Sequence, residues 1–592
     1  MLVGGWGAYA AELLDRAFTN RGRNVHRVGN LTMPAAPDAL VDGWSCWLFG
    51  EPRDRGGLAE SFGLKANEDL ASAFGRALAE LSADACGLLC GRFAVVAHHY
   101  GRDDCLLVRD QLGAQPLVFT RVGDGVLFSE HERDLLEMLP RTPSPDRLAL
   151  LQWVENGLVP AGRTLYEGLH SLRAGHRLHM DQHGSRSERW WRLQFAGVDA
   201  GSEGMLADAL RAAAYSAVSR ALTGSERPAV KLSGGLDSAC VAAGLAASEL
   251  ADGRALALAG TFADHPATDE SHLIEATARH TRLTLEQIPF DPSSSMLAPA
   301  VEHIVRWRLP PATPNLFLWR PLMARARELG VDLILDGEGG DELFGLAPVF
   351  IADMLRSGRL RAAWSLTRGV PGVGHDPGGR TRVRLLRDFG LRPLMPRVVQ
   401  RRLEMRHSGS PNSIVPPADA AALAGLASRG WGHGDGPLWW RSQVECMIDD
   451  RDLLGMGAHF RREDVDEAID RRHPFLYDLQ LIEAALRLPP QALFDPVRDR
   501  PLLRDALAGE IPDEVRTRHR KSYFTTVVLA GIRADEAGLI EPLRRTDAPI
   551  RAYVATSALE RKIAISPDRR LIQEAAALWR VAIINRWLAS LA

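Results

Sequence analysis

The sequence has no long apolar run and no cysteine framework, and these absences exclude several protein classes. No uninterrupted apolar stretch reaches membrane-spanning length, and the N-terminus lacks the charged-then-apolar order of a signal peptide. The six cysteines form no Cys-x-x-Cys pair, which argues against a disulfide framework or zinc site and is typical of a reduced protein. A net charge of -3 argues against a general nucleic-acid binder. We therefore expect a cytoplasmic protein with neither a membrane nor a nucleic acid as partner.

Lysine is also scarce. Only four of the 71 basic residues are lysines, namely Lys65, Lys231, Lys521 and Lys562. Where arginine is used so freely, a remaining lysine indicates a position that needs a compact, rotatable ammonium. Chance retention is the alternative, and it applies above all to Lys65 and Lys562. The length of 592 residues predicts two or three domains.

Residues 230–238 have the pattern of a strand, a tight turn and a helix. Two glycines let the backbone approach a ligand, and the following helix N-terminus favours an anion. Asp237 would repel a bare phosphate but holds one through Mg²⁺. The spacing does not fit a Walker loop, which ends in Lys-Ser/Thr. The alternative is a Gly/Ser turn before a core helix.

The string Ser-Gly-Gly-Leu-Asp-Ser within this stretch resembles the pyrophosphate-binding loop of ATP pyrophosphatases. These enzymes split ATP into AMP and pyrophosphate, so the resemblance implies ATP and Mg²⁺ as cofactors. The loop residues expected to bind the nucleotide are Leu232, Ser233, Gly234, Gly235, Leu236, Asp237 and Ser238.

Strands alternate with helices from about residue 203 onward. A helical apolar pattern covers 205–222, and strand-like runs at 256–262 and 331–335 follow the strand before the loop. This alternation predicts an α/β fold with a doubly wound parallel sheet, whose ligands bind beyond the carboxyl ends of the strands. Both glycine-rich stretches, at 230–238 and 336–345, lie at such strand ends, so we expect them to face the same nucleotide. Thr261 is also expected to bind it.

The string Gly-Glu-Gly-Gly-Asp-Glu-Leu-Phe-Gly in that stretch resembles a motif of the asparagine-synthetase-like family. The resemblance implies that Asp237 and Asp341 hold Mg²⁺ on the phosphates and that Glu338 lies at the reacting centre. Gly337 and Gly339 are expected to contact the nucleotide. Two carboxylates on opposite loops can clamp one cation over a polyphosphate. Helix N-capping is the alternative for Asp341.

Residues 1–200 are β-rich, with strand-like runs at 93–97 and 105–108 and a hairpin signal at 123–125. The string Arg-Asp-Gln-Leu-Gly-Ala-Gln-Pro-Leu at 109–117, among others, resembles the glutaminase domain of asparagine synthetases. The resemblance implies an Ntn-type β sandwich over 1–200, followed by a synthetase domain with a helical C-terminal part over 201–592.

The glutaminase of that family uses a cysteine directly after the initiator methionine as its nucleophile. This sequence has Leu2 there, and the nearest cysteine is Cys46. We therefore expect a degenerate glutaminase-like domain that releases no ammonia from glutamine. Cys46 as a substitute nucleophile is the alternative, but it has no free α-amine beside it.

Two later segments resemble further family motifs. Asp470 stands where the β-lactam-forming relatives have a Glu that supports deprotonation of the attacking amine; an ion pair with a nearby arginine is the alternative. Lys521 matches a lysine whose ammonium neutralises charge on the pyrophosphate and the tetrahedral intermediate; a solvated basic turn is the alternative. Asp336 departs from the family, which often has Ser or Thr at that position.

Residues 355–406 form an arginine-rich insertion with little family resemblance. It contains thirteen arginines against three acidic residues, and the Gly/Pro cluster at 371–379 predicts a mobile loop. A solvated helix face and a docking surface for an acidic peptide or partner are the two interpretations.

The combined resemblance is to amide-forming enzymes that adenylate a carboxylate, and it is strongest to the lasso peptide macrolactam cyclases. On that interpretation the side chain of an Asp or Glu in a precursor peptide is activated, and the N-terminal amine of the peptide closes the ring. A leader-peptide-recognition protein and a leader peptidase are the expected partners. The alternatives are a β-lactam synthetase-like cyclase, a glutamine-independent amidotransferase, and a catalytically inactive scaffold.

Overall fold

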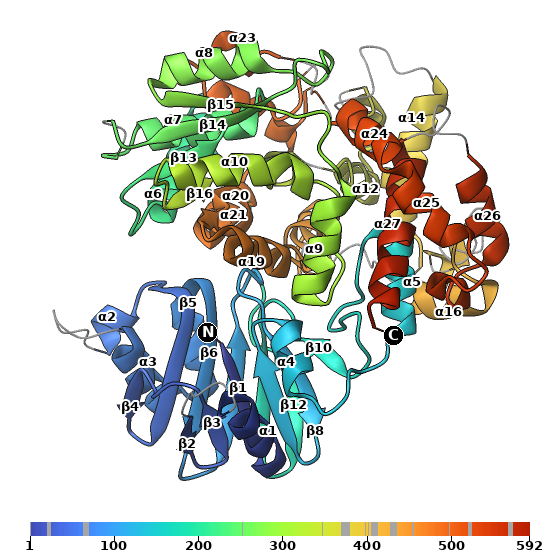
Figure 1. The fold of residues 1–592 in the computed structure, drawn as a ribbon. Coiled ribbons are helices and arrows are strands. Elements are labelled where there is room, and N and C mark those ends of the chain that lie inside the picture. The colour runs from blue at the N-terminus through green and yellow to red at the C-terminus, as the bar shows by residue number, and fades with distance from the viewer. Residues whose placement is uncertain are drawn as a thin grey trace.

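The computed structural model consists of an N-terminal β sandwich, a parallel sheet flanked by helices, and a helical C-terminal part (Figure 1). The described residues are 2–19, 25–62, 70–250, 253–345, 347–368, 379–396, 398–400, 402–403, 413–426, 435–450, 452, 455–495, 498–518, 522, 524–565 and 572–591. Among them, no helix combines the length and the apolar composition that crossing a membrane requires.

Two six-stranded antiparallel sheets build the N-terminal part. The first sheet contains, in spatial order, β10 (Leu169–Ser171), β8 (Val118–Val122), β9 (Gly125–Ser129), β1 (Val3–Trp6), β3 (Leu31–Met33) and β2 (His26–Val28). The second contains β12 (Gly184–Arg189), β11 (His176–Asp181), β7 (Asp104–Arg109), β6 (Leu89–His99), β5 (Trp44–Asp54) and β4 (Ala39–Val41). The hairpin predicted at 123–125 joins β8 to β9.

Strand β6 contributes side chains to two hydrophobic cores, one on each face of its sheet. Its residues Ala94 and Val96 lie in the core between the two sheets, whereas Phe93 and Val95 pack toward helix α3 (Leu70–Leu81). Successive side chains of a strand point to opposite faces, so one strand serves both cores. Helix α1 (Ala8–Thr19) covers the outer face of the other sheet (Figure 1). The order helix, sheet, sheet, helix confirms the predicted sandwich.

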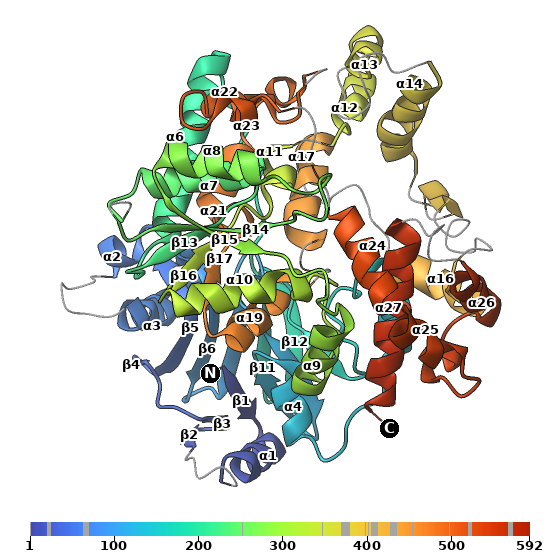
Figure 2. The ribbon, with the colours of Figure 1, turned by 45° about the horizontal axis from the view of Figure 1, so that its top comes forward.

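Five parallel strands form the sheet of the second part. Their spatial order is β15 (Thr284–Pro289), β14 (Leu256–Thr261), β13 (Pro228–Lys231), β16 (Leu333–Leu335) and β17 (Asp470–Arg472). Ala229 packs on one face with α10 (Leu316–Glu328), and Val230 packs on the other with α6 (Glu203–Ala221) and α7 (Leu236–Ala246) (Figure 2). Helices therefore cover both faces, which confirms the doubly wound fold.

Two strands of this sheet have no counterpart among the sequence-based expectations. Strand β15 has no buried residue, and β17 consists of the three charged residues Asp-Arg-Arg. Such short or charged strands carry no apolar run that a sequence pattern could reveal. Strand β17 pairs with β16 although they lie far apart in the sequence.

The C-terminal helices connect the two halves of the molecule. Helix α27 (Ile572–Ala589) packs against α5 (Arg147–Asn156) of the N-terminal part, and Trp587 stacks edge-on against Tyr166 at 5.4 Å between ring centroids (Figure 1). The insertion contains the end of α12 (Phe350–Arg356), then α13 (Leu360–Leu366), α14 (Gly379–Leu385), the π-helix Leu386–Leu391 and the 3₁₀ helix Arg392–Leu394. Most of the loop predicted at 371–379 lies outside the described residues.

The remaining helices are shorter or peripheral. They are α2 (Leu58–Ser61), α4 (Glu132–Met138), α8 (Ser271–Thr281), α9 (Leu297–Trp307), α11 (Gly340–Phe344), α16 (Pro417–Leu426), α17 (Leu438–Val444), α19 (Met456–Glu467), α20 (Pro474–Tyr477), α21 (Leu479–Ala485), α22 (Pro501–Ala506), α23 (Asp513–Arg516), α24 (Thr525–Ala534), α25 (Glu536–Arg544) and α26 (Thr556–Ala564).

Candidate active site

The loop between β13 and α7 is fixed by its own serine side chains. The Oγ atoms of Ser233 and Ser238 lie 2.9 Å apart, and Ser238 Oγ also accepts a hydrogen bond from the Ser233 backbone N–H at 3.1 Å. The Gly234 N–H donates to Glu270 at 3.0 Å, and a Cβ at Gly234 would lie 2.7 Å from the Glu270 side chain. The glycine is therefore required because the loop passes directly over Glu270.

Glycines also allow the second predicted loop, after β16, to touch the first. A Cβ at Gly337 would lie 2.6 Å from the backbone nitrogen of Ser238, and one at Gly340 would lie 2.5 Å from the carboxyl carbon of Asp237. Gly339 adopts φ 90°, a left-handed conformation that favours glycine. It is also the N-cap of α11, so Asp341 lies inside the helix and does not cap it.

A cavity of about 250 Å³ lies between these loops at the carboxyl edge of the sheet. The predicted residues that line it are Leu232, Ser233, Gly235, Asp237, Ser238, Gly337, Glu338, Gly339 and Asp341. Three aromatic side chains, those of Phe262, Trp319 and Phe524, form other parts of its wall. The two motifs thus meet at the edge where ligands bind in such sheets.

Three predicted nucleotide contacts do not line this cavity. Gly234 is turned toward Glu270, and Leu236, the first residue of α7, is buried in the core. Thr261 lies between Gly260 and Phe262, which do line the cavity, and its carbonyl accepts a hydrogen bond from the Phe290 N–H. Binding roles for these residues stay predictions.

Arg500, which the sequence analysis did not single out, joins the two carboxylates predicted to bind metal. Its Nη1 lies 2.6 Å from each carboxylate oxygen of Asp237 and 2.8 Å from Oδ1 of Asp341. The carboxylates therefore converge on one point, and oxygen donors from two carboxylates suit Mg²⁺. No motif marks Arg500, which is 263 residues from Asp237 in the sequence.

Lys231 places its ammonium in the wall of the same cavity. Its Nζ lies 3.4 Å from Asp336, 3.5 Å from Glu338 and 4.7 Å from the ring centroid of Trp319. Burial by itself would lower the pKa of Lys231, but the two carboxylates outweigh it and hold the pKa above its usual value. Lys231 therefore stays charged beside Glu338, the residue predicted at the reacting centre.

Asp336 connects this ammonium to His473. Nδ1 of His473 lies 2.8 Å from Oδ1 of Asp336, and both side chains are buried. Burial would raise the pKa of Asp336, but the neighbouring His473 and Lys231 outweigh it and hold the pKa below its ordinary range. Asp336 therefore has two side-chain partners here, the buried His473 and the partly buried Lys231.

Asp470 lies in the interface between the two halves of the molecule. Its carboxylate pairs with Arg472 at 3.0 Å, Arg92 at 3.3 Å and Arg461 at 3.9 Å, and it does not line the cavity between the loops. These three arginines line a second cavity of about 230 Å³. The contacts accord with the ion-pair alternative, and a catalytic role for Asp470 stays a prediction.

Lys521 lies outside the described residues, but the segment that contains it reaches the site. Arg518 donates to Glu270 at 2.5 Å and to Ser522 at 2.7 Å, and Phe524 lines the cavity. The role of Lys521 therefore stays a prediction.

The thiols of the N-terminal part are buried. Burial raises the pKa of Cys46 and of Cys86 to about 12, and it also raises the pKa of Cys90 and Cys105. A protonated, inaccessible thiol is a poor nucleophile. Cys46 is therefore unsuited to replace the missing nucleophile.

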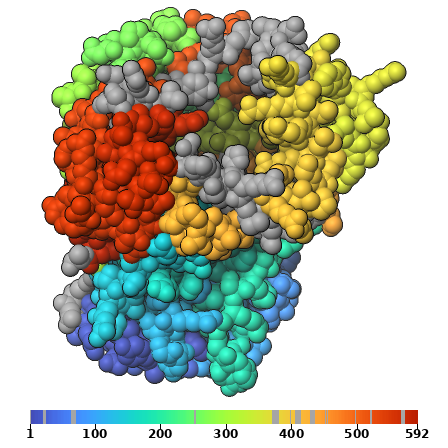
Figure 3. Space-filling model, turned by 90° about the vertical axis from the view of Figure 1, so that its right-hand side faces the viewer, coloured from blue at the N-terminus to red at the C-terminus, as the bar shows by residue number. Residues whose placement is uncertain are grey.

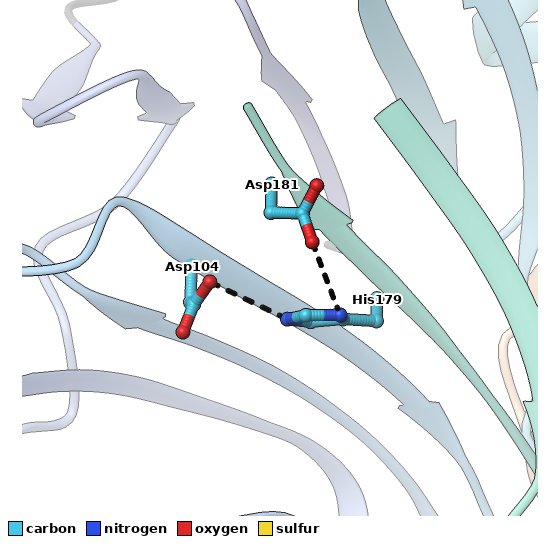
Figure 4. A group of neighbouring side chains, drawn as sticks. All are labelled: Asp104, His179 and Asp181. Carbon is cyan, nitrogen blue, oxygen red and sulfur yellow. Dashed lines mark ion pairs between the residues drawn. The ribbon is translucent and has the colours of Figure 1, made fainter. Parts of the chain in front are cut away.

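Among the described residues, one group outside the cavity has the residue types of a metal site. It consists of Asp104 on β7 with His179 and Asp181 on β11 (Figure 4). Nε2 of His179 lies 3.5 Å from Asp104 and Nδ1 lies 3.7 Å from Asp181. The two ring nitrogens face different carboxylates, so the contacts are those of an ion-paired histidine.

Comparisons with known proteins agree with both halves of the fold. The family model described as asparagine synthase matches residues 209–589, and the model described as glutamine amidotransferase domain matches residues 73–191. Asparagine synthetase [glutamine-hydrolyzing] 3 of Bacillus subtilis is 24% identical over 473 residues, which cover 76% of this chain and 69% of that protein. Amidase chyE of Penicillium rubens is 27% identical over 291 residues, which cover 45% of this chain and 41% of that protein.

Two solved structures are also similar, at low TM-scores. Glutamine phosphoribosylpyrophosphate amidotransferase of B. subtilis matches with a TM-score of 0.22 and 11% identity, covering 48% of this chain and 65% of that one. Glutamine-dependent NAD⁺ synthetase of Acinetobacter baumannii matches with a TM-score of 0.16 and 14% identity, covering 47% and 53%.

Proposed function

Because this chain belongs to the asparagine synthase family, we propose that it joins a carboxylate to an amine at the expense of ATP and releases AMP and pyrophosphate. Members of this family are ATP-dependent amide ligases that generally use ATP and Mg²⁺. One observation supports the proposal above the others: two glycine-dependent loops bring Asp237 and Asp341 to one point in one cavity. The carboxylates would hold Mg²⁺, which supplies positive charge against the phosphates.

The proposed reaction has two steps. A carboxylate oxygen attacks the α-phosphorus of ATP, and pyrophosphate leaves. The amine then attacks the acyl carbon, AMP leaves, and the amine loses a proton. The ammonium of Lys231 lies in the cavity wall, where it can stabilise negative charge that develops on the acyl group. The helix α7 begins at the loop, so its N-terminus also favours the phosphates.

For the substrate, we propose a precursor peptide whose Asp or Glu side chain is joined to its N-terminal amine, as in lasso peptide cyclases. The insertion supports this because it exposes apolar and basic side chains together. Its exposed apolar residues are Leu360, Trp364, Val383, Leu391, Leu394, Val398, Val399 and Leu403. Its exposed arginines are Arg356, Arg359, Arg361, Arg368, Arg380, Arg384, Arg387 and Arg402. We call these two sets together the insertion surface.

The insertion surface suits an acidic peptide that also carries apolar residues. Contiguous exposed apolar groups are typical of interaction sites, and arginines pair with carboxylates through two hydrogen bonds. In Figure 3 the insertion, in yellow, borders a hollow whose other side is formed by the red C-terminal helices. Helix α12 of the insertion also follows α11, which carries Asp341, after a short connection. A peptide bound there would lie near the cavity.

A leader-peptide-recognition protein and a leader peptidase belong to the same proposal, because a ring can close only on a newly freed N-terminal amine. A small amino-acid substrate is the second candidate. It is favoured by the similarity to asparagine synthetase over 76% of this chain.

The test is to incubate the purified protein with ATP, Mg²⁺ and a panel of synthetic peptides that vary the position of one acidic residue. We expect AMP and pyrophosphate in equal amounts with a product that has lost one water, detected by mass spectrometry. ADP formed in step with product would contradict the AMP-forming mechanism. Aspartate or another small acid amidated by ammonia would favour the second candidate.

A pair of variants tests the insertion surface. Replacing Arg359 and Arg361 together by Glu should raise KM for the peptide and leave KM for ATP unchanged, because these side chains lie on α13 or just before it. Arg16→Glu is the matched control, since Arg16 is an exposed arginine of α1 in the N-terminal part. An unchanged KM for the peptide in the double variant would remove the surface from the proposal.

A further inference from the structure

Arg500 fills the point at which the two proposed metal ligands meet. Its Nη1 contacts three carboxylate oxygens, two of Asp237 at 2.6 Å and one of Asp341 at 2.8 Å. The Arg500 side chain is 7% exposed, so water screens these contacts poorly. One guanidinium nitrogen therefore neutralises both carboxylates, which would otherwise repel each other.

The guanidinium is held from its other side as well. Nε and Nη2 of Arg500 lie 3.0 Å and 2.8 Å from Oδ2 of Asp499, and Arg504 of α22 also contacts Asp499. The backbone of Arg500 has φ 49° and ψ 52°, a left-handed conformation that is uncommon outside glycine. Such a conformation persists only where surrounding contacts outweigh its cost.

A magnesium ion and this guanidinium require the same oxygens. Mg²⁺ binds carboxylate oxygens at about 2.0–2.1 Å. An ion shared by Asp237 and Asp341 would lie close to the present position of Nη1, and two cations so close together repel strongly. Arg500 must therefore release at least one carboxylate before both can bind the ion.

We propose that Arg500 makes metal binding depend on nucleotide: it holds Asp237 and Asp341 together, and it yields them to Mg²⁺ when the phosphates of ATP offer the guanidinium a new partner. Arginine binds phosphate through two parallel hydrogen bonds, so the exchange replaces one strong set of contacts with another. The proposal rests on the proposed function only in taking ATP as the nucleotide. In this proposal Arg500 positions the two carboxylates and contacts the phosphates once ATP is bound.

The proposal makes two predictions of opposite sign for Arg500→Gln. Without the guanidinium, the two carboxylates should bind free Mn²⁺, a spectroscopic substitute for Mg²⁺, about tenfold more tightly in the absence of nucleotide. The same variant should bind a non-hydrolysable ATP analogue with Mg²⁺ about tenfold more weakly, because the phosphates lose a donor. A residue that only maintains the fold would weaken both affinities or neither.

The experiment uses the full chain, with electron paramagnetic resonance to count free Mn²⁺ and calorimetry for the analogue. Arg498→Gln is the matched control, since Arg498 lies two residues away but pairs with Asp495 and Asp505. Its two affinities should match those of the unchanged protein. Arg500→Lys keeps the positive charge, so its affinity for free Mn²⁺ should stay low even if Arg500→Gln unfolds.

Tighter Mn²⁺ binding without nucleotide in Arg500→Gln, together with weaker analogue binding, would support the proposal. Unchanged or weaker Mn²⁺ binding in a folded Arg500→Gln protein would overturn it, as would tight Mn²⁺ binding by Arg500→Lys. If the unchanged protein fails to bind the analogue with Mg²⁺, the proposed function itself fails, and the two outcomes are therefore distinguishable.

Discussion

Replacing Lys231 by methionine removes a partly buried positive charge and leaves the buried carboxylate of Asp336 with fewer partners. Nζ of Lys231 lies 3.4 Å from Oδ2 of Asp336, whose side chain is only 3% exposed. Removing one partner of a buried ion pair costs about 3–5 kcal/mol, because an uncompensated charge stays behind. His473 at 2.8 Å and the Glu338 backbone N–H at 3.1 Å still contact Asp336. We therefore expect the lower end of the range, about 3 kcal/mol.

Hydrogen–deuterium exchange of the backbone amides in β13 and β16 measures the loss of stability in this part of the sheet. A local measurement is needed because a protein of several domains need not unfold in one step. Asp336→Asn alone leaves the ammonium with Glu338 as its only carboxylate partner among the described residues, whereas the double variant removes both charges. The double variant should therefore be more stable than the sum of the two single changes predicts, by about 1–3 kcal/mol. A cost below about 1 kcal/mol for Lys231→Met, or additive costs, would refute the reasoning.

The same pair gives a prediction for pH. The pKa of Asp336 lies below its ordinary value in the folded protein, so its ionised form stabilises the fold above about pH 4, and this stabilisation is lost as the pH falls further. Lys231→Met should move the pKa of Asp336 back toward its ordinary value. The variant should then be less stable at pH 7 and lose less of its stability between pH 4 and lower pH.

Four further predictions follow from other parts of the molecule. Gly340→Ala should weaken the binding of ATP with Mg²⁺ at least about tenfold in calorimetry, because its Cβ would lie 2.5 Å from the carboxyl carbon of Asp237. Burial lowers the pKa of His131 to about 3, so lowering the pH from 7 to 5 should cost roughly 2 kcal/mol of stability; His131→Gln should lose less over that range in thermal melts. The protein should release no glutamate from glutamine, since the described thiols of the N-terminal part are buried, and measurable release would contradict this. Lys521→Arg should slow AMP formation about a hundredfold with little change in ATP affinity, and a normal rate would make Lys521 a surface residue.

The sequence predicted the fold and the two loops because both depend on local patterns. Strand–turn–helix units and glycine spacing each extend over only a few neighbouring residues. Gly337 and Gly340 are needed because a Cβ would collide with the first loop. The meeting of the two loops could be predicted because both follow strands of one parallel sheet, whose ligands bind beyond the carboxyl ends of the strands.

Local sequence patterns did not predict the positions of Arg500 and Asp470 in the structure. Arg500 reaches Asp237 from 263 residues away, and among 71 basic residues no feature distinguishes it. Asp470 lies on β17, a three-residue charged strand without an apolar run, so neither the strand nor the direction of its side chain could be predicted. Its position depends on which arginines the two halves of the molecule bring together.

A row of three residues at the edge of the sheet links its topology to the chemistry of the cavity. Strand β13 ends at Lys231, Asp336 follows β16, and His473 follows β17, and the register of these parallel strands places the three side by side. Because ammonium, carboxylate and imidazole are neighbours in a buried row, a change in one leaves a charge without its partner. The buried carboxylate of Asp336 therefore depends on the ammonium beside it. That ammonium must also fit over the ring of Trp319, 4.7 Å away, between two carboxylates. A planar guanidinium would fill this space poorly, which accounts for one of the few lysines in an arginine-rich chain.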